Sequence, residues 1–236
     1  MLPLLKICGV ASPASAALID GVADYVGTVV APPGLTPRAA TPGEARRVAR
    51  ALAESTHVTV AAGMGPWEGL EAALAAGSQV LQPHAPLTPS LLDRLLEEAE
   101  RHGIRVAPVL QYSRGEWSPR PRSLLPVLRS HRGSVEYVLL DAAKGEPRRG
   151  PPGWGLRVPP GPLAYAAEAL SGEARVAVAG GVSDATACTA ARLGASVVDV
   201  SSWADRPGMP GVKDPGRVAL LADALRGCTV GGGGVA

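Results

Sequence analysis

The sequence predicts an α/β protein, a single (βα)8 TIM barrel, and three observations favour this fold. The chain has 236 residues, close to the roughly 250 that such barrels commonly use. Hydrophobic residues make up 46% of the chain and charged residues 19%, which provides enough apolar surface for a large core. Short runs rich in β-branched and apolar residues alternate with stretches rich in Ala, Leu and Arg, a pattern typical of repeated strand–helix units.

Eight strand–helix units follow one another along the chain. Several predicted strands are almost continuous apolar runs, as expected of parallel strands that are covered on both faces. The clearest helix start is Thr41-Pro42-Gly43-Glu44, which offers a capping hydroxyl, a proline for the first turn and a glutamate that can close a capping box. Further helix starts are Thr88-Pro89, Ser183-Asp184 and Asp214-Pro215. The predicted strands are residues 4–9, 25–30, 58–62, 79–82, 105–110, 136–140, 175–179 and 196–200.

Neither a linker nor a change in composition divides the sequence, so we expect one domain over residues 1–236, with 228–236 as a frayed tail. Residues 142–160 are rich in Gly, Pro and Arg and form a long strand–helix connection, and such loops are usually functional or mobile. Eight units are also compatible with an open doubly wound sheet. The barrel is favoured because no Gly-x-Gly-x-x-Gly motif follows the first strand.

Charge and composition exclude several classes of partner. The formal net charge is only +2, which argues against nucleic acid as a partner. No apolar run approaches the roughly 20 residues of a membrane span, and the first residues lack a basic region, so a cytoplasmic protein is expected. Cys8, Cys188 and Cys228 are an odd number at wide spacing, which predicts neither a disulfide framework nor a metal site. We interpret Cys188 and Cys228 as packing or exposed residues.

The barrel topology selects candidate site residues, because reacting groups lie at the carboxyl ends of barrel strands. Side chains two residues apart in a strand share a face, so Lys6 and Cys8 are expected to point together into the barrel mouth. Asp141 ends the sixth strand, and His84 and Asp199 lie on the corresponding faces of the fourth and eighth. The mouth is therefore predicted to hold all five residues.

The chemistry of these residues points to proton transfer. Asp141 is a natural acid or base, and an ammonium group at Lys6 would favour the thiolate of Cys8 near neutral pH. A purely structural interpretation stays open: Cys8 can be a small buried hydrophobic residue, Lys6 can pair with an acid such as Asp141, and a single His84 can be a core residue.

The last two units also offer an anion site. Ala179-Gly180-Gly181-Val182-Ser183 leads a strand through glycines into a helix start, where free N–H groups and the helix dipole attract phosphate. Ser201 and Ser202 follow the eighth strand and can add donors beside it. Phosphate sites after strands seven and eight are frequent in this fold.

The motifs resemble those of the phosphoribosylanthranilate isomerase family from the first strand to the last helix. Lys6-Ile7-Cys8-Gly9-Val10 is similar to the opening motif of that family, and Pro210-Gly211-Val212-Lys213-Asp214-Pro215 is similar to its last motif. Between them, the motifs that match in order and spacing are Ala23-Asp24-Tyr25-Val26-Gly27, Val80-Leu81-Gln82-Pro83-His84, Leu139-Leu140-Asp141-Ala142, Ala179-Gly180-Gly181 and Val198-Asp199-Val200-Ser201-Ser202.

The resemblance implies an Amadori rearrangement of N-(5′-phosphoribosyl)anthranilate in tryptophan biosynthesis, without a metal or an organic cofactor. It makes Cys8 the general base and Asp141 the general acid, and it assigns Arg38 to the anthranilate part. Lys6, His84 and Asp199 are further substrate-binding residues. The phosphate is assigned to Gly180, Gly181, Ser201 and Ser202. The expected partner is a phosphorylated small molecule, with no nucleic acid or membrane, and the expected state is a monomer or homodimer.

Two departures from the family pattern and two rival functions accompany this interpretation. Where relatives carry a Gly-Gly-Thr-Gly-like segment, this chain has Gly150-Pro151-Pro152-Gly153-Trp154-Gly155, and prolines lack the N–H that can bind phosphate. Trp203 stands where the family usually has glycine, so it crowds the phosphate region or caps the barrel. The rivals are another phosphosugar barrel, such as an epimerase or a Schiff-base aldolase using Lys144, and a non-catalytic barrel that binds a phosphorylated metabolite.

Overall fold

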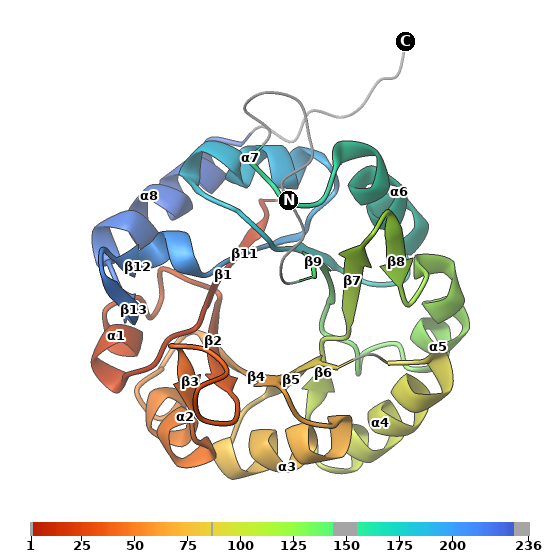
Figure 1. Cartoon of the computed structure of the whole chain (residues 1–236), viewed down its shortest axis with the longest axis horizontal. Coiled ribbons are helices and arrows are strands. Elements are labelled where there is room, and N and C mark those ends of the chain that lie inside the picture. Colours follow the sequence, from red (N-terminus) through yellow and green to blue (C-terminus); the bar gives the residue numbers. More distant parts are fainter. Residues whose placement is uncertain (1, 86, 144–154, 229–236) are drawn as a thin grey trace.

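A computed structural model of the chain describes residues 2–85, 87–143 and 155–228. Parallel strands form a barrel, and helices surround it (Figure 1). β11 pairs with β1 in parallel, so the last strand of the barrel lies beside the first. Around the barrel the strands are β1 (Leu4–Cys8), β2 (Tyr25–Val30), β4 (Thr56–Ala62), β5 (Val80–His84), β6 (Arg105–Val106), β7 (Val109–Ser113), β9 (Val138–Ala142), β10 (Val176–Val178) and β11 (Val197–Val200).

The predicted fifth strand is divided into β6 and β7, and this division completes the barrel. β6 pairs with β5 near the amino-terminal end, whereas β7 pairs with β9 further along. Pro108 lies between the two pieces and has no N–H to donate, but its carbonyl accepts a hydrogen bond from the Leu139 amide at 2.9 Å. The eight predicted strands and the barrel topology are therefore confirmed, and the open sheet is excluded.

The helices begin where the capping signals predicted. Thr41 and Glu44 form both hydrogen bonds of a capping box, and Thr88 and Asp214 accept hydrogen bonds from amides in the first turns of their helices. In the described part of the chain no helix is long and apolar enough to cross a membrane. The helices are α1 (Pro13–Ala17), α2 (Pro42–Ala49), α3 (Pro66–Ala76), α4 (Pro89–Arg101), α5 (Leu125–Ser130), α6 (Pro160–Leu170), α7 (Asp184–Arg192) and α8 (Pro215–Arg226).

Shorter elements decorate the ends of the barrel strands. β3 (Ala39–Ala40) pairs with β2, and β8 (Glu116–Ser118) forms a hairpin with β7. β12 (Asp205–Arg206) pairs with β13 (Met209–Lys213) just before α8. Two short 3-10 helices, η1 (Pro121–Leu124) and η2 (Ser202–Ala204), precede α5 and follow β11, respectively.

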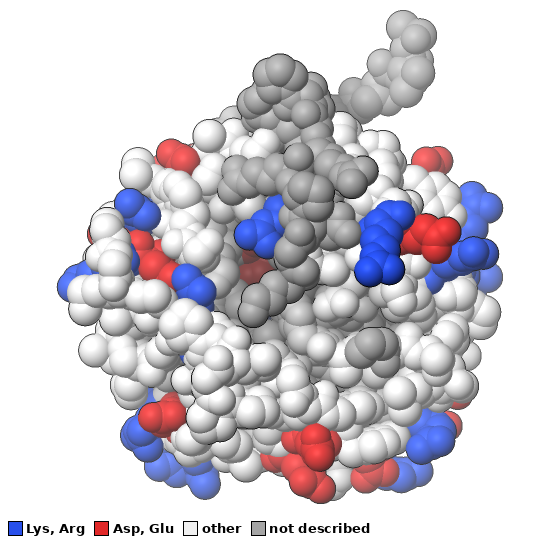
Figure 2. Space-filling view, viewed as in Figure 1, with Lys and Arg blue, Asp and Glu red and all other residues white. Residues whose placement is uncertain are grey.

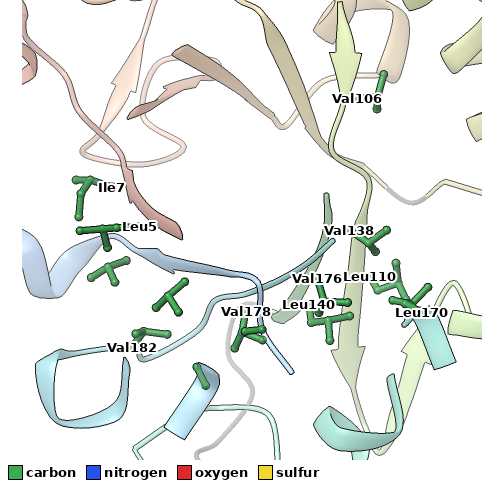
Figure 3. Packing of buried hydrophobic residues seen from close by; sticks show 14 of the residues in the cluster. Leu5, Ile7, Val106, Leu110, Val138, Leu140, Leu170, Val176, Val178 and Val182 are labelled. Atoms are coloured by element: carbon green, nitrogen blue, oxygen red, sulfur yellow. The ribbon is translucent and has the colours of Figure 1, made fainter. Parts of the chain in front are cut away.

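Strand alternation sorts the buried side chains into two layers. The outer layer lies between strands and helices and includes Leu5 and Ile7 of β1 and Val138 and Leu140 of β9 (Figure 3). The inner layer fills the barrel with the alternate residues, among them Cys8, Tyr137 and Leu139. Because Ile7 is fully buried against the helices, the prediction that Lys6 and Cys8 point into the barrel is confirmed.

A polar cluster closes the amino-terminal end of the barrel. Tyr25 and Tyr137 pack edge to face inside it, with ring centroids 5.5 Å apart. The Tyr25 hydroxyl donates to the Glu136 carboxylate, which also forms ion pairs with Arg105 and Arg175. The amino-terminal ends of four strands are thereby joined across the barrel axis.

A disulfide bond joins Cys188 to Cys228, and it corrects two predictions from the sequence. The two Cα atoms are 5.4 Å apart, although the residues are 40 positions apart in the chain. Cys188 lies in α7 and Cys228 lies two residues beyond the end of α8, and these two helices pack against each other. The packing of the helices therefore brings together cysteines that the spacing did not pair. Cys228 is 3% exposed and fixed by the bond, so the frayed tail does not begin there.

Candidate active site

The carboxyl ends of the barrel strands surround a cavity of about 330 Å³. Eight of the ten residues that the sequence predicted for the site line it: Cys8, His84, Asp141, Gly180, Gly181, Asp199, Ser201 and Ser202. In Figure 2, charged side chains lie mostly around the periphery of the molecule, and some are also visible near its centre. The strands thus gather residues from the first, fourth, sixth, seventh and eighth units around one space.

Lys6 does not line the cavity, because it is fully buried within the barrel. Its Nζ lies 2.5 Å from Oδ2 of Asp199, so the partner of Lys6 is Asp199 and not Asp141. The other oxygen of Asp199, Oδ1, is buried and has no hydrogen-bond partner among the described residues. Lys6 therefore orients Asp199 and leaves one of its carboxylate oxygens beside the cavity.

Cys8 is a free, buried thiol at the end of β1. Burial raises the pKa of Cys8 above its ordinary value, and the charge of Lys6 offsets this only in part. The negative charge of Asp199 also raises the pKa of Cys8, because it repels the thiolate. The structure thus differs from the expectation that Lys6 makes Cys8 a thiolate near neutral pH, since the thiol is the favoured form in the free protein.

Asp141 lies on β9 with its carboxylate in the cavity. Burial raises its pKa to about 6, and the negative charge of Asp199 acts in the same direction. The amide of Ala142 donates to Oδ1 of Asp141 at 2.8 Å, and this hydrogen bond limits the rise. A carboxyl group with a pKa near neutrality is suited to proton transfer.

His84 belongs to a buried hydrogen-bond chain. The Tyr137 hydroxyl donates to Oε1 of Gln82 at 3.0 Å, which leaves the Gln82 amide NH2 to donate to Nε2 of His84, also at 3.0 Å. Burial lowers the pKa of His84 to about 4, so its ring is neutral. With Nε2 accepting, the proton of this ring is on Nδ1.

The Gly180-Gly181 turn fits only glycine. Both residues have positive φ, +83° and +91°, a region that other residues rarely adopt. A Cβ on Gly180 would lie 2.9 Å from Oδ1 of Asp141, and one on Gly181 would lie 2.6 Å from the Gly155 carbonyl oxygen. The turn therefore brings backbone close to the acid and leads into the amino terminus of α7, where an anion is favoured.

Arg38 does not line the cavity either; it belongs to a buried ion network beside it. Its Nε lies 2.9 Å from Oδ2 of Asp205, and one of its terminal nitrogens also pairs with this carboxylate. The fully buried Lys213 lies 2.6 Å from Oδ1 of Asp205 and donates to the Ser201 carbonyl at 3.2 Å. Two cations share one carboxylate, so the network carries one excess positive charge next to the serine turn.

The sequence did not single out several residues that the structure places at the site. Gln82 and Gln111 line the cavity, and strand alternation from Val80 and Val109 is the signal that finds them. Lys213 stands within the last family-like motif, but nothing in the sequence shows its pairing with Asp205. Arg157 also lines the cavity, and it lies within the long connection of residues 142–160, which gives no strand or helix pattern.

Of the residues that depart from the family pattern or support a rival function, the structure describes Trp203. Trp203 packs against the hydrophobic core, and the Arg217 guanidinium lies 5.6 Å from the centre of its ring. Because Trp203 does not line the cavity, it does not crowd the serine turn. Lys144 and residues 150–154 lie outside the described residues.

The chain is similar to proteins of known name over almost its whole length. It is 39% identical to N-(5′-phosphoribosyl)anthranilate isomerase of Pyrobaculum islandicum over 94% of this chain and 97% of the relative. It is 36% identical to the protein of the same name from Aeropyrum pernix, over 95% and 98% of the two chains. No family model matches the sequence.

Solved structures show the same fold at lower identity. The phosphoribosyl anthranilate isomerase of Thermotoga maritima superposes with a TM-score of 0.71 at 23% identity, over 96% of this chain and all of that one. A 3-hexulose-6-phosphate synthase superposes with a TM-score of 0.66 at 19% identity, over 94% and 99% of the two chains, so the fold alone does not select the reaction. The reaction is selected by the sequence identity of 36–39% to the curated relatives, which extends over nearly the whole chain. The chain belongs to the N-(5′-phosphoribosyl)anthranilate isomerase family.

Proposed function

We propose that this chain converts N-(5′-phosphoribosyl)anthranilate to 1-(2-carboxyphenylamino)-1-deoxyribulose 5-phosphate, with Cys8 as general base and Asp141 as general acid. The observation that supports these roles is that the thiol of the first strand and the carboxyl of the sixth line one cavity, which also contains the Gly180-Gly181 and Ser201-Ser202 turns. A phosphosugar needs such an arrangement, because its phosphate and its reacting carbons are bound at the same time.

The reaction is an isomerisation by two proton transfers. Asp141 donates a proton to the ribose ring oxygen while the nitrogen lone pair forms the C1′ imine and the C1′–oxygen bond breaks. Cys8 as thiolate then removes the proton from C2′, giving an enolamine that tautomerises to the ketone. A well-placed acid or base contributes about 10²- to 10⁴-fold to such a step.

The fraction of the protein that is ready to react depends on how Asp141 and Cys8 share their protons. The mechanism starts from protonated Asp141 and ionised Cys8, whereas the pKa of Asp141 is about 6 and burial raises the pKa of Cys8 above its ordinary value. The single proton therefore lies mostly on Cys8, and only a minor fraction of the free protein carries it on Asp141. This fraction does not change with pH between the two pKa values, because both arrangements bind the same number of protons.

The remaining site residues have binding roles in this proposal. The unpartnered Oδ1 of Asp199 is suited to accept a hydrogen bond from a ribose hydroxyl. Arg38 carries the charge suited to the anthranilate carboxylate, and Asp205 and Lys213 fix its position. His84 offers a neutral Nδ1–H donor. Lys6 acts on the substrate only through Asp199 and Cys8, because it is buried beneath them.

The setting of the enzyme is also proposed. We expect one domain that works in the cytoplasm as a monomer or homodimer and binds a phosphorylated small molecule. Monomers of the dimeric Thermotoga maritima relative have been solved, so both states occur in this fold.

The test is to follow the loss of fluorescence of freshly made phosphoribosylanthranilate. We expect Cys8→Ser and Asp141→Asn each to lower kcat at least 100-fold. Asp223→Asn, which changes an exposed aspartate of α8 outside the cavity, is the matched control and should keep full activity. Full activity of both site variants would refute the assignment of acid and base, and a wild-type protein that consumes no substrate would refute the function.

A further inference from the structure

Arg157 is the only lysine or arginine among the cavity-lining residues that the structure describes. Its backbone amide donates to the Gly180 carbonyl at 2.9 Å, which fixes the start of its side chain beside the glycine turn. The residue is exposed as well as lining the cavity, so its side chain is accessible from solvent.

The stem of Arg157 runs along the Gly180-Gly181 turn. A Cβ built on Gly180 would lie 3.7 Å from Cβ of Arg157, and one built on Gly181 would lie 3.7 Å from its Cγ. These distances are ordinary van der Waals separations, so the arginine stem lies alongside the turn. The glycine turn and the arginine form one wall of the cavity, and the serine turn at Ser201 lines the same space.

The charge of Arg157 is available to a ligand. Lys6, Arg38 and Lys213 are each paired with a buried carboxylate. Within residues 2–85, 87–143 and 155–228, no carboxylate forms an ion pair with the Arg157 guanidinium. At longer range the charge of Arg157 lowers the pKa of Asp141, which lines the same cavity. An unneutralised guanidinium beside a helix amino terminus is a strong site for a phosphate dianion.

We propose that Arg157 binds the phosphate group of the substrate, as a charged clamp added to the backbone donors of the glycine and serine turns. The preceding segment contains Pro151 and Pro152, which have no amide hydrogen to offer an anion. The guanidinium replaces such donors with a planar fork that matches two phosphate oxygens. The identity of the substrate rests on the proposed function, but the phosphate contact does not.

Inorganic phosphate tests the contact without turnover. Phosphate that binds only the folded protein raises the unfolding temperature, and its Kd follows from the concentration dependence. We expect Arg157→Met to weaken phosphate binding about 10- to 100-fold, the effect of losing charge-assisted hydrogen bonds. Arg157→Lys, which keeps the charge but not the fork, should lie between. The matched control Arg120→Met removes an exposed arginine outside the cavity and should bind phosphate like the wild type.

A second probe separates the two anions of the substrate. Anthranilate carries a carboxylate but no phosphate, so its inhibition constant should not change in Arg157→Met if the arginine binds phosphate. Weaker anthranilate binding with unchanged phosphate binding would overturn the proposal, as would equal phosphate affinity of Arg157→Met and the wild type.

Kinetics with the full substrate complete the test. We expect Arg157→Met to raise KM for phosphoribosylanthranilate about 10-fold or more, while Cys8→Ser and Asp141→Asn lower kcat. Phosphate binding that depends on Arg157 in a protein without isomerase activity would support the contact and contradict the function. If the enzyme is active and its KM is unchanged in Arg157→Met, the function is supported and the phosphate contact is contradicted.

Discussion

The disulfide between Cys188 and Cys228 allows a prediction of its contribution to stability. It ties the middle of α7 to a residue just beyond the end of α8. α7 packs against β11 and α8 packs against β1, so the bond links the helices at the closure of the barrel. Reduction, or the double substitution Cys188→Ser and Cys228→Ser, removes the link without touching the cavity. We expect either change to lower the free energy of unfolding.

The magnitude follows from the length of the closed loop. With a separation of 40 residues, the chain-entropy relation gives about 13 cal/mol/K for the restriction of the unfolded chain. This corresponds to about 4 kcal/mol at 25 °C. In a domain of this size each kcal/mol shifts the unfolding temperature by about 2–4 °C, so we expect Tm to fall by roughly 8 to 16 °C.

The assay is thermal unfolding by circular dichroism with and without a reductant, combined with thiol counting in denaturant. The chain has three cysteines, so the oxidised protein should show one free thiol, Cys8, and the reduced protein three. The double serine variant is the control: its Tm should equal that of the reduced wild type and should not respond to reductant. Three free thiols before reduction, or an unchanged Tm after it, would refute the reasoning.

Four further predictions concern pH and buried groups. Asp141 and Cys8 share one proton above the pKa of Asp141 and bind two protons below it, so kcat/KM should fall about tenfold per pH unit below about pH 6. Above pH 6 kcat/KM should stay flat until the Cys8 thiol itself ionises, and a profile that rises tenfold per pH unit just above pH 6 would contradict the pairing. Burial lowers the pKa of His57 to about 4, so the unfolded chain binds the extra proton between pH 6.5 and 4 and stability is lost as the pH falls through this range. The buried His84 acts over the same range in both proteins, so urea unfolding should show a loss that is about 3 kcal/mol larger in the wild type than in His57→Gln. Asp205→Asn leaves the buried Lys213 without its carboxylate, and urea titration at pH 7 should show a loss of about 3 kcal/mol, against less than 1 for a surface change such as Asp223→Asn. Gly181→Ala places a methyl group against the Gly155 carbonyl at a positive φ, so it should weaken phosphate binding more than tenfold in the thermal-shift assay, and wild-type affinity would show that the turn has room to move.

Periodicity was sufficient to predict the barrel and its mouth. Alternation within the first strand placed Cys8 inside and Ile7 outside, and the structure confirms both. The position of Asp141 at the end of the sixth strand followed from the same rule. These predictions depend only on local order along a strand, which the sequence contains directly.

Contacts between distant segments were the part that the sequence did not reveal. The pairing of Arg38 with Asp205 could not be predicted, because 167 positions separate the two residues and only the closed barrel brings them together. The disulfide was missed because helix packing, and not spacing, pairs its cysteines. The thiolate of Cys8 was expected from one neighbouring charge, whereas burial and Asp199 decide its pKa. Each error concerns a tertiary environment that no local pattern encodes.

The polar cluster at the base of the barrel restricts how molecules pass through the protein. Tyr25, Tyr137 and Glu136 are each 6% exposed or less, so nothing the size of a sugar phosphate passes at that end. Substrate therefore enters and product leaves by the same opening, past the Gly180-Gly181 turn. Product bound at this opening blocks the entry of the next substrate molecule, so release of the ketose can limit the rate of the whole catalytic cycle.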